Sequence, residues 1–272
     1  MVSSVVANMI AAVALVILGW ALSIMVRLPF VYRHRRELFR FFGITKDKQR
    51  LMVYLSTVFV QPFGSADFRG ASRSFSGPAI PAIELAAVQP VLQLFLSPVL
   101  DGLPSRMREW LGDRGHWTFR LVLPTFSASP AETSQVQPEN MLAVGSQYYN
   151  AAADLYAETE NPFLKMEQVG AQMRIRVLKG PRSGDTFEAR PESGDDMAIV
   201  ERLLDDAHNT TIFIAAGLGV VGTRGAVQYL VDNWARLHKD FGVEPFAVCL
   251  RFQDVAADPN AYRKPVELSR FH

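Results

Sequence analysis

The first 26 residues of this chain contain no charged side chain, whereas the next 24, Arg27 to Arg50, contain eight Lys or Arg and two acidic residues. A helix of about 20 apolar residues spans the hydrocarbon layer of a bilayer, and a basic flank stays on the cytoplasmic side. The boundary therefore predicts a transmembrane anchor over residues 1–26 and a basic juxtamembrane segment over 27–50. We expect a single-pass protein of the cell inner membrane, with its N-terminus outside and its C-terminal domain in the cytoplasm.

Two other interpretations of the apolar segment fit its composition less well. A cleaved signal peptide normally carries its positive charge before the apolar stretch, and here the charge follows it. A buried helix of a globular domain normally shows a polar stripe, which Ser3, Ser4, Asn8 and Ser23 do not supply.

Residues 51–272 are expected to form one cytoplasmic α/β domain. Strand-like apolar runs alternate with helical stretches, which is typical of a Rossmann-like three-layer domain with a mostly parallel sheet. Alternation in period two over residues 171–179, followed by a turn, predicts an inserted β-hairpin. Residues 79–100 predict a helix kinked at Pro90, with a second membrane span as the alternative. The expected strands lie at residues 51–61, 117–127, 141–144, 211–216 and 244–253.

A glycine-rich turn follows one of these strands and precedes a helix. Gly217, Gly219 and Gly222 form the pattern G-x-G-x-x-G, in which glycines permit a tight turn and the helix N-terminus offers free N–H groups to a phosphate. Thr223 and Arg224 extend the pattern, and a guanidinium can bind phosphate through two hydrogen bonds. The acidic residue of a redox dinucleotide site is misplaced here. A nucleotide or other anion site, or a turn without a ligand, remain open.

A second turn, at Gly145 and Ser146 with Asn150 after it, also lies between a strand and a helix. Open α/β sheets bind ligands in a crevice at the carboxyl ends of their strands, so both turns are expected to face one site. Ser146 acting only as a helix N-cap is the alternative. Arg69 and Arg73 lie in a loop rich in Gly and Ser after the first strand, and we expect this loop to close over a phosphate.

The sequence assigns no catalytic residue, no metal site and no cofactor. Cys249 lies in an apolar run, where a cysteine usually serves as a small buried hydrophobe. The five histidines lie far apart, with no metal-binding spacing, and no nucleophile elbow, Walker loop or kinase loop is present. An enzyme is therefore disfavoured. The alternative hypothesis is a membrane-tethered enzyme acting on nucleosides or nucleotides, with Glu84, Asp67 or Asp232 as candidate catalytic residues without an assigned role.

The layout, with VGSQYYN and AAGLGVVGTRGA at strand ends, resembles membrane effectors of bacterial antiphage nucleotide-signalling systems. The resemblance implies a sensor for a nucleotide or oligonucleotide, made by a partner nucleotidyltransferase, and transmembrane helices that assemble into a pore or disrupt the bilayer. One helix cannot enclose a pore, so a homo-oligomer is expected, with small residues such as Ala11 and Gly19 allowing close helix packing. A non-catalytic membrane scaffold is a further alternative.

Overall fold

The computed structural model describes residues 2–45, 47–55, 58–60, 77–79, 82–96, 106–107, 118–122, 136, 138–147, 150–159, 162–170, 172–189 and 194–272. Its centre is a seven-stranded sheet in the order β12-β11-β9-β10-β5-β1-β4. The strands of this sheet are β1 (Arg50–Leu55), β4 (Thr118–Val122), β5 (Met141–Val144), β9 (Asp196–Asp205), β10 (Thr210–Gly217), β11 (Phe246–Phe252) and β12 (Val266–Phe271).

Two smaller sheets accompany it. One contains β6 (Leu164–Val169), β7 (Gln172–Val177) and β8 (Thr186–Glu188), and the other pairs β2 (Val58–Val60) with β3 (Gly77–Ala79). The helices are α1 (Val2–Phe41), α2 (Ala82–Phe95), α6 (Ala151–Thr159), α7 (Val220–Phe241) and the short 3-10 helix η2 (Ala261–Arg263).

The central sheet is mixed, which corrects the prediction of a mostly parallel sheet. Strands β10, β5, β1 and β4 pair in parallel, whereas β12, β11, β9 and β10 pair antiparallel, as do all strands of the two smaller sheets. The reason is the short connection between β9 and β10, because a tight turn joins antiparallel neighbours and a parallel pair needs a long crossover. The predicted β-hairpin insertion is likewise a three-stranded antiparallel sheet, since β6 adds to β7 and β8.

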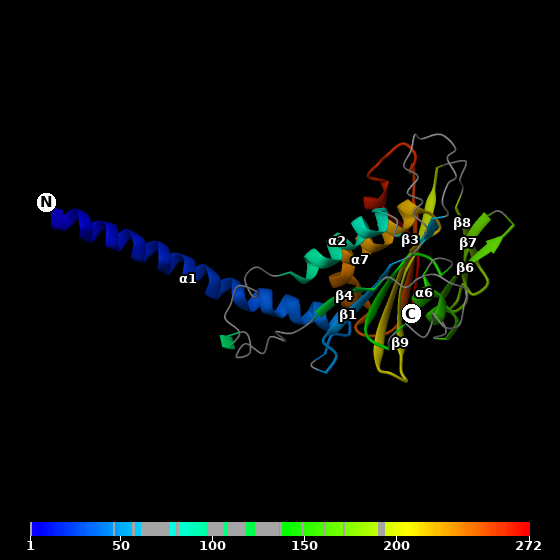
Figure 1. Cartoon of the computed structure of the whole chain (residues 1–272), viewed down its shortest axis with the longest axis horizontal. Helices are drawn as coiled ribbons and strands as arrows, with labels where there is room; N and C mark the ends of the chain where they lie inside the picture. Colours follow the sequence, from blue (N-terminus) through cyan, green and yellow to red (C-terminus); the bar gives the residue numbers. More distant parts are fainter. Residues whose placement is uncertain are drawn as a thin grey trace, which may run out of the picture.

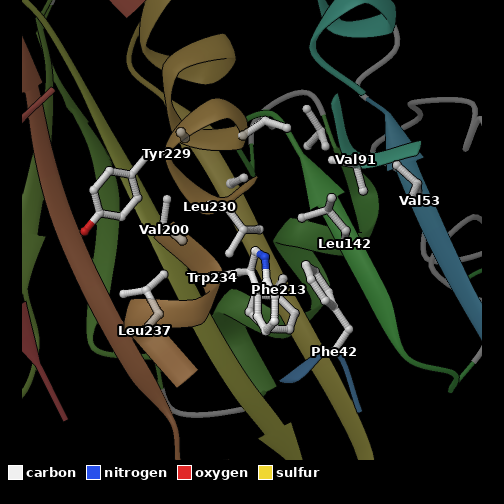
Figure 2. Close-up of a cluster of buried hydrophobic side chains, with 14 of the residues drawn as sticks. Phe42, Val53, Val91, Leu142, Val200, Phe213, Tyr229, Leu230, Trp234 and Leu237 are labelled. Atoms are coloured by element: carbon white, nitrogen blue, oxygen red, sulfur yellow. The ribbon is translucent and has the colours of Figure 1, made fainter. Parts of the chain in front are cut away.

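The two faces of the central sheet are covered differently (Figure 1). Helices α2 and α7 and the end of α1 pack on one face, and their side chains form one apolar cluster with alternate strand residues. Figure 2 shows Leu230 and Trp234 of α7 beside Val200 and Phe213 of the sheet. The other face packs against α6 and the three-stranded sheet. The α/β class therefore agrees with the prediction, while the strand directions do not.

Helix α1 runs without a break from Val2 to Phe41, and Pro29 lies inside it. Figure 1 shows its N-terminal part extending away from the sheet. At its other end Leu38 and Phe41 are buried in the core. No helix among the described residues is both long enough and apolar enough to cross a membrane.

This finding overturns the transmembrane anchor predicted over residues 1–26. Residues 2–26 are the first part of a helix that continues through the basic segment and into the domain core, so the charge boundary at Arg27 is not a structural boundary.

Helix α2 agrees with the prediction of a helix containing Pro90. Its side chains Ala87, Val88, Val91 and Phe95 are buried in the same cluster as α7. The apolar run of residues 79–100 is thus explained, where it is described, by packing of one helix face on the domain.

Candidate functional site

The glycine turn between β10 and α7 is as tight as the sequence predicts. A Cβ atom on Gly217 would lie 2.1 Å from the backbone nitrogen of Thr223, a distance that no side chain tolerates. The Thr223 hydroxyl accepts a hydrogen bond from the Gly217 N–H at 3.0 Å and donates one to the Gly219 carbonyl at 3.1 Å. The glycines therefore serve the close approach of the strand end to the first turn of α7.

A carboxylate of the chain itself occupies the N-terminus of α7. Asp196 accepts hydrogen bonds from the backbone N–H groups of Gly219 at 2.9 Å and Gly222 at 2.6 Å, and from its neighbour Met197 at 2.7 Å. Because β9 is antiparallel to β10, the start of β9 lies at the edge where β10 ends. Burial raises the pKa of Asp196, while the three N–H groups oppose this shift. The donors that the sequence offers to a phosphate thus donate to Asp196.

The second predicted turn lies beside the first. Gly145 has φ of +104° and its N–H donates to the Ala215 carbonyl at 3.0 Å, which joins the turn to β10. Ser146 is buried there. Strands β5 and β10 pair in parallel with Val144 beside Ala215, so the two turns lie at the same edge of the sheet.

Asn150 ties the ends of two parallel strands together. Its side-chain amide donates to the carbonyl oxygens of Tyr54 in β1 and Val144 in β5, each at 2.9 Å. Its side-chain oxygen accepts from the Ala152 N–H at 3.0 Å, so Asn150 caps α6, the role considered for Ser146. Both polar atoms of its side chain are engaged within the protein, and the residue is fully buried.

Arg224 is engaged by the segment before β12. Its guanidinium carbon lies 3.8 Å from the ring centre of Tyr262, and its Nη2 donates to the Tyr262 hydroxyl at 2.9 Å. Arg263 donates to the same hydroxyl at 2.8 Å. Arg224 therefore holds η2 against α7. The other two predicted phosphate ligands, Arg69 and Arg73, lie outside the described residues.

A pocket of about 410 Å³ adjoins the glycine turn. Gly219 and Leu218 form one side of it, and Asp195 and Asp196 are the charged residues among its described lining. Two carboxyl groups suit the hydroxyl or amine groups of a ligand better than a phosphate. The carboxyl edge of the sheet, so far as it is described, is thus acidic where the sequence predicted a phosphate site.

The residues considered for an alternative enzyme do not gather there. Asp232 is exposed on α7 and accepts from Gln228 at 2.8 Å. Asp67 and the side chain of Glu84 lie outside the described residues. In the part of the chain that the structure describes, no group of His, Cys, Asp and Glu could hold a metal ion.

Two charged residues in the middle of β9 were missed by the sequence analysis. Glu201 is fully buried and accepts a hydrogen bond from the N–H of Phe163, and burial raises its pKa to about 8. Arg202 points to the opposite face, where it donates to the carbonyls of Glu244 at 2.8 Å and Gly242 at 3.0 Å. Burial lowers its pKa to about 10, so it stays charged at neutral pH. The only signal was an adjacent Glu-Arg pair within an apolar run.

Comparison of the chain with protein-family models, with curated proteins and with solved structures finds no match. Its function must therefore be argued from its own residues.

Proposed function

We propose that the protein is a membrane-associated, non-catalytic effector. Its α/β domain senses a nucleotide or other anionic signal, and α1 attaches the domain to lipid and brings several copies together. The observation that carries the proposal is the continuity of α1, because one helix joins an exposed apolar segment to the buried core of the domain. The relation to antiphage signalling systems stays a hypothesis.

The exposed side of α1 supports the lipid contact. Large apolar side chains are normally buried, but four on this helix are each more than 65% exposed: Leu15, Val16, Met25 and Phe30. A helix can bury such side chains in the interface of a bilayer without crossing it.

The packing of α1 supports communication with the domain. Phe41 and Phe42, at and just after the end of α1, contact the ring of Phe213 in β10, with ring centres 5.1 and 4.9 Å apart. Strand β10 ends at Gly217, where the glycine turn begins. A change at that turn therefore has a direct route along one strand to the end of α1.

Flotation of the full chain with vesicles tests the lipid contact. We expect the protein to rise with vesicles, and the double variant Leu18→Asp/Met25→Asp to remain below them, because each change places a carboxylate on the exposed apolar segment. Val169→Asp is the matched control, since Val169 is an exposed apolar residue on β6. A native protein that stays with the unbound fraction, or a double variant that floats as well as the native one, would refute the proposal.

Sensing and assembly are tested on the detergent-purified protein. Mass measurement with and without nucleotides is expected to show more than one copy per particle and a change in that number with a bound nucleotide. A strictly monomeric protein that retains no nucleotide would remove this part of the proposal.

A further inference from the structure

A second pocket, of about 540 Å³, lies where α1 meets the sheet. It is at the opposite edge from the glycine turns, because it is lined by Thr211 at the start of β10 and not by the end of that strand. Thr211 and Gly217 are six residue steps apart along an extended strand, a span of about 20 Å. This pocket is therefore distinct from the site that the sequence predicts.

Three arginines line the pocket, and none of its described lining residues carries a carboxylate. Arg36 and Arg40 come from α1 and Arg202 from β9. The remaining lining residues are Phe41, Gly43, Ile44, Thr45, Leu204, Asn209, Thr211 and Val243. Glu244, whose negative charge acts on Arg202, is exposed and is not a lining residue.

Arg202 is a fixed cation at this place. It is 1% exposed, and its guanidinium lies 5.3 Å from the ring centre of Phe41 and 5.0 Å from that of Phe246. It donates to the carbonyl oxygens of Gly242 and Glu244, which are dipoles without net charge. Its positive charge is thus held in place without a carboxylate bound to it among the described residues.

Arg36 and Arg40 are the exposed cations of the pocket. They lie four residues apart on α1 and so share one side of the helix, where like charges repel by about 0.2–0.5 kcal/mol. Both are exposed, and neither forms an ion pair with a described residue. The neighbouring Arg33 contrasts with them, because its Nε binds the carboxylate of Glu37 at 3.0 Å. An anion bound between Arg36 and Arg40 would relieve the repulsion between their positive charges.

Four carbonyl groups near the pocket already accept hydrogen bonds from side chains of the protein, so they do not face an anion as free acceptors. Arg202 donates to the carbonyls of Gly242 and Glu244, which follow α7, and the side-chain amide of Asn140 donates to the Gly43 carbonyl at 2.8 Å. Lys48 holds the turn before β10 by donating to the Asn209 carbonyl at 3.0 Å. Hydroxyl groups of Thr45 and Thr211 add neutral hydrogen-bonding partners to the lining.

We infer that this pocket binds a phosphate-bearing ligand and thereby joins α1 to the sheet. Guanidinium groups match phosphate oxygens in geometry and charge, and the volume is that of a small-molecule site. The phosphate can belong to a soluble molecule or to a lipid headgroup. The helix rise of 1.5 Å per residue places Arg40 about 20 Å beyond Val26 along α1, which favours the soluble source. The inference stands whether or not the proposed function holds.

Titration calorimetry of the full chain in detergent with inorganic pyrophosphate and with ATP tests the soluble source. We expect saturable binding that weakens at least tenfold in Arg36→Gln/Arg40→Gln. Arg27→Gln/Arg33→Gln is the matched control, because it removes the same charge from the same helix outside the pocket, and it is expected to leave affinity within twofold. Both double variants should have the same unfolding temperature as the native protein, since the replaced arginine side chains are exposed.

Vesicles of phosphatidylcholine with and without phosphatidic acid test the lipid source. A gain in binding from phosphatidic acid that disappears only in Arg36→Gln/Arg40→Gln assigns the phosphate to a headgroup. The inference is overturned if neither pyrophosphate, ATP nor phosphatidic acid binds through these arginines, or if the control variant loses as much affinity. Loss of all vesicle binding with pyrophosphate binding intact would count against the proposed function alone.

Discussion

The carboxylate of Asp196 lies 2.6 Å from the backbone nitrogen of Gly222, inside the first turn of α7. Helix N-termini attract anions because their first N–H groups lack partners and carry partial positive charge. In this chain the anion is supplied by the first residue of the neighbouring strand β9. The interaction therefore fixes the start of α7 to the sheet.

Replacing Asp196 by Ala is expected to destabilise the protein by about 1–3 kcal/mol, because buried N–H groups lose their acceptor. Urea unfolding of the full chain measures the loss. Asp195→Ala is the control, since Asp195 lines the same pocket and, among the described residues, makes no hydrogen bond to α7. It should change stability by less than about 0.5 kcal/mol. Equal effects of the two substitutions would contradict the assigned role.

Glu201 makes stability depend on pH. Its pKa is about 8 in the folded protein, against 4.5 for an ordinary glutamate, so the folded state favours the protonated form. The stabilisation is complete below about pH 4.5 and is lost as pH rises through 8, a total on the order of 5 kcal/mol.

Glu201→Gln is expected to remove this dependence, because the amide stays neutral and keeps an oxygen for the Phe163 N–H. Unfolding free energies from pH 5 to 8.5 should fall for the native chain and stay flatter for the variant. Parallel pH curves for the two proteins would show that Glu201 does not titrate in this range.

Asn150 is expected to act as a structural tie. Asn150→Ala should cost about 2 kcal/mol or more, since the carbonyls of Tyr54 and Val144 lose their donor and α6 loses its cap. Asn150→Asp keeps the cap but turns a carboxylate toward the two carbonyls. Its loss of stability should therefore shrink as the pH falls from 7 toward about 4, because burial raises the pKa of this carboxyl group and protonation removes its charge. Thermal unfolding at pH 4 and pH 7 distinguishes the two variants, and stability unchanged in Asn150→Ala would argue against the tie.

Gly225 is required by the packing of α7 on β11. A Cβ atom there would lie 2.3 Å from the ring of Phe252. Gly225→Ala is expected to lose about 1–3 kcal/mol through overpacking, more than the gain of up to about 1 kcal/mol in helix propensity. In the double variant with Phe252→Leu, the alanine should cost much less than it does alone. Strict additivity of the two changes, measured by urea unfolding, would exclude this contact as the cause.

The sequence predicted best the elements whose signals are local. The strand before Gly217, the turn after it and the helix ended by Gly242 are all confirmed. The Gly242 N–H donates to the His238 carbonyl at 2.8 Å, and Gly242 has φ of +60°. Such caps depend on neighbouring residues alone.

Strand β9 was missed because its central residues have distant partners. Glu201 and Arg202 stand side by side in the chain, a pattern that normally indicates an exposed segment. Both are buried on opposite faces, since Phe163 and Gly242 supply their hydrogen bonds from about 40 residues away. Because β9 was missed, the sequence analysis predicted neither the mixed sheet nor the position of Asp196. It therefore placed a phosphate where the carboxylate of Asp196 binds the N-terminus of α7.

The buried part of helix α1 is much shorter than its exposed part. Its buried end, from Leu38 to Phe41, is short, whereas the exposed apolar segment reaches back to Val13. At 1.5 Å per residue, Val13 lies about 37 Å from Leu38, so a tilt of about 10° at the buried end displaces Val13 by about 6 Å. A small shift of Arg36 and Arg40 is therefore enlarged several-fold at the tip of the helix.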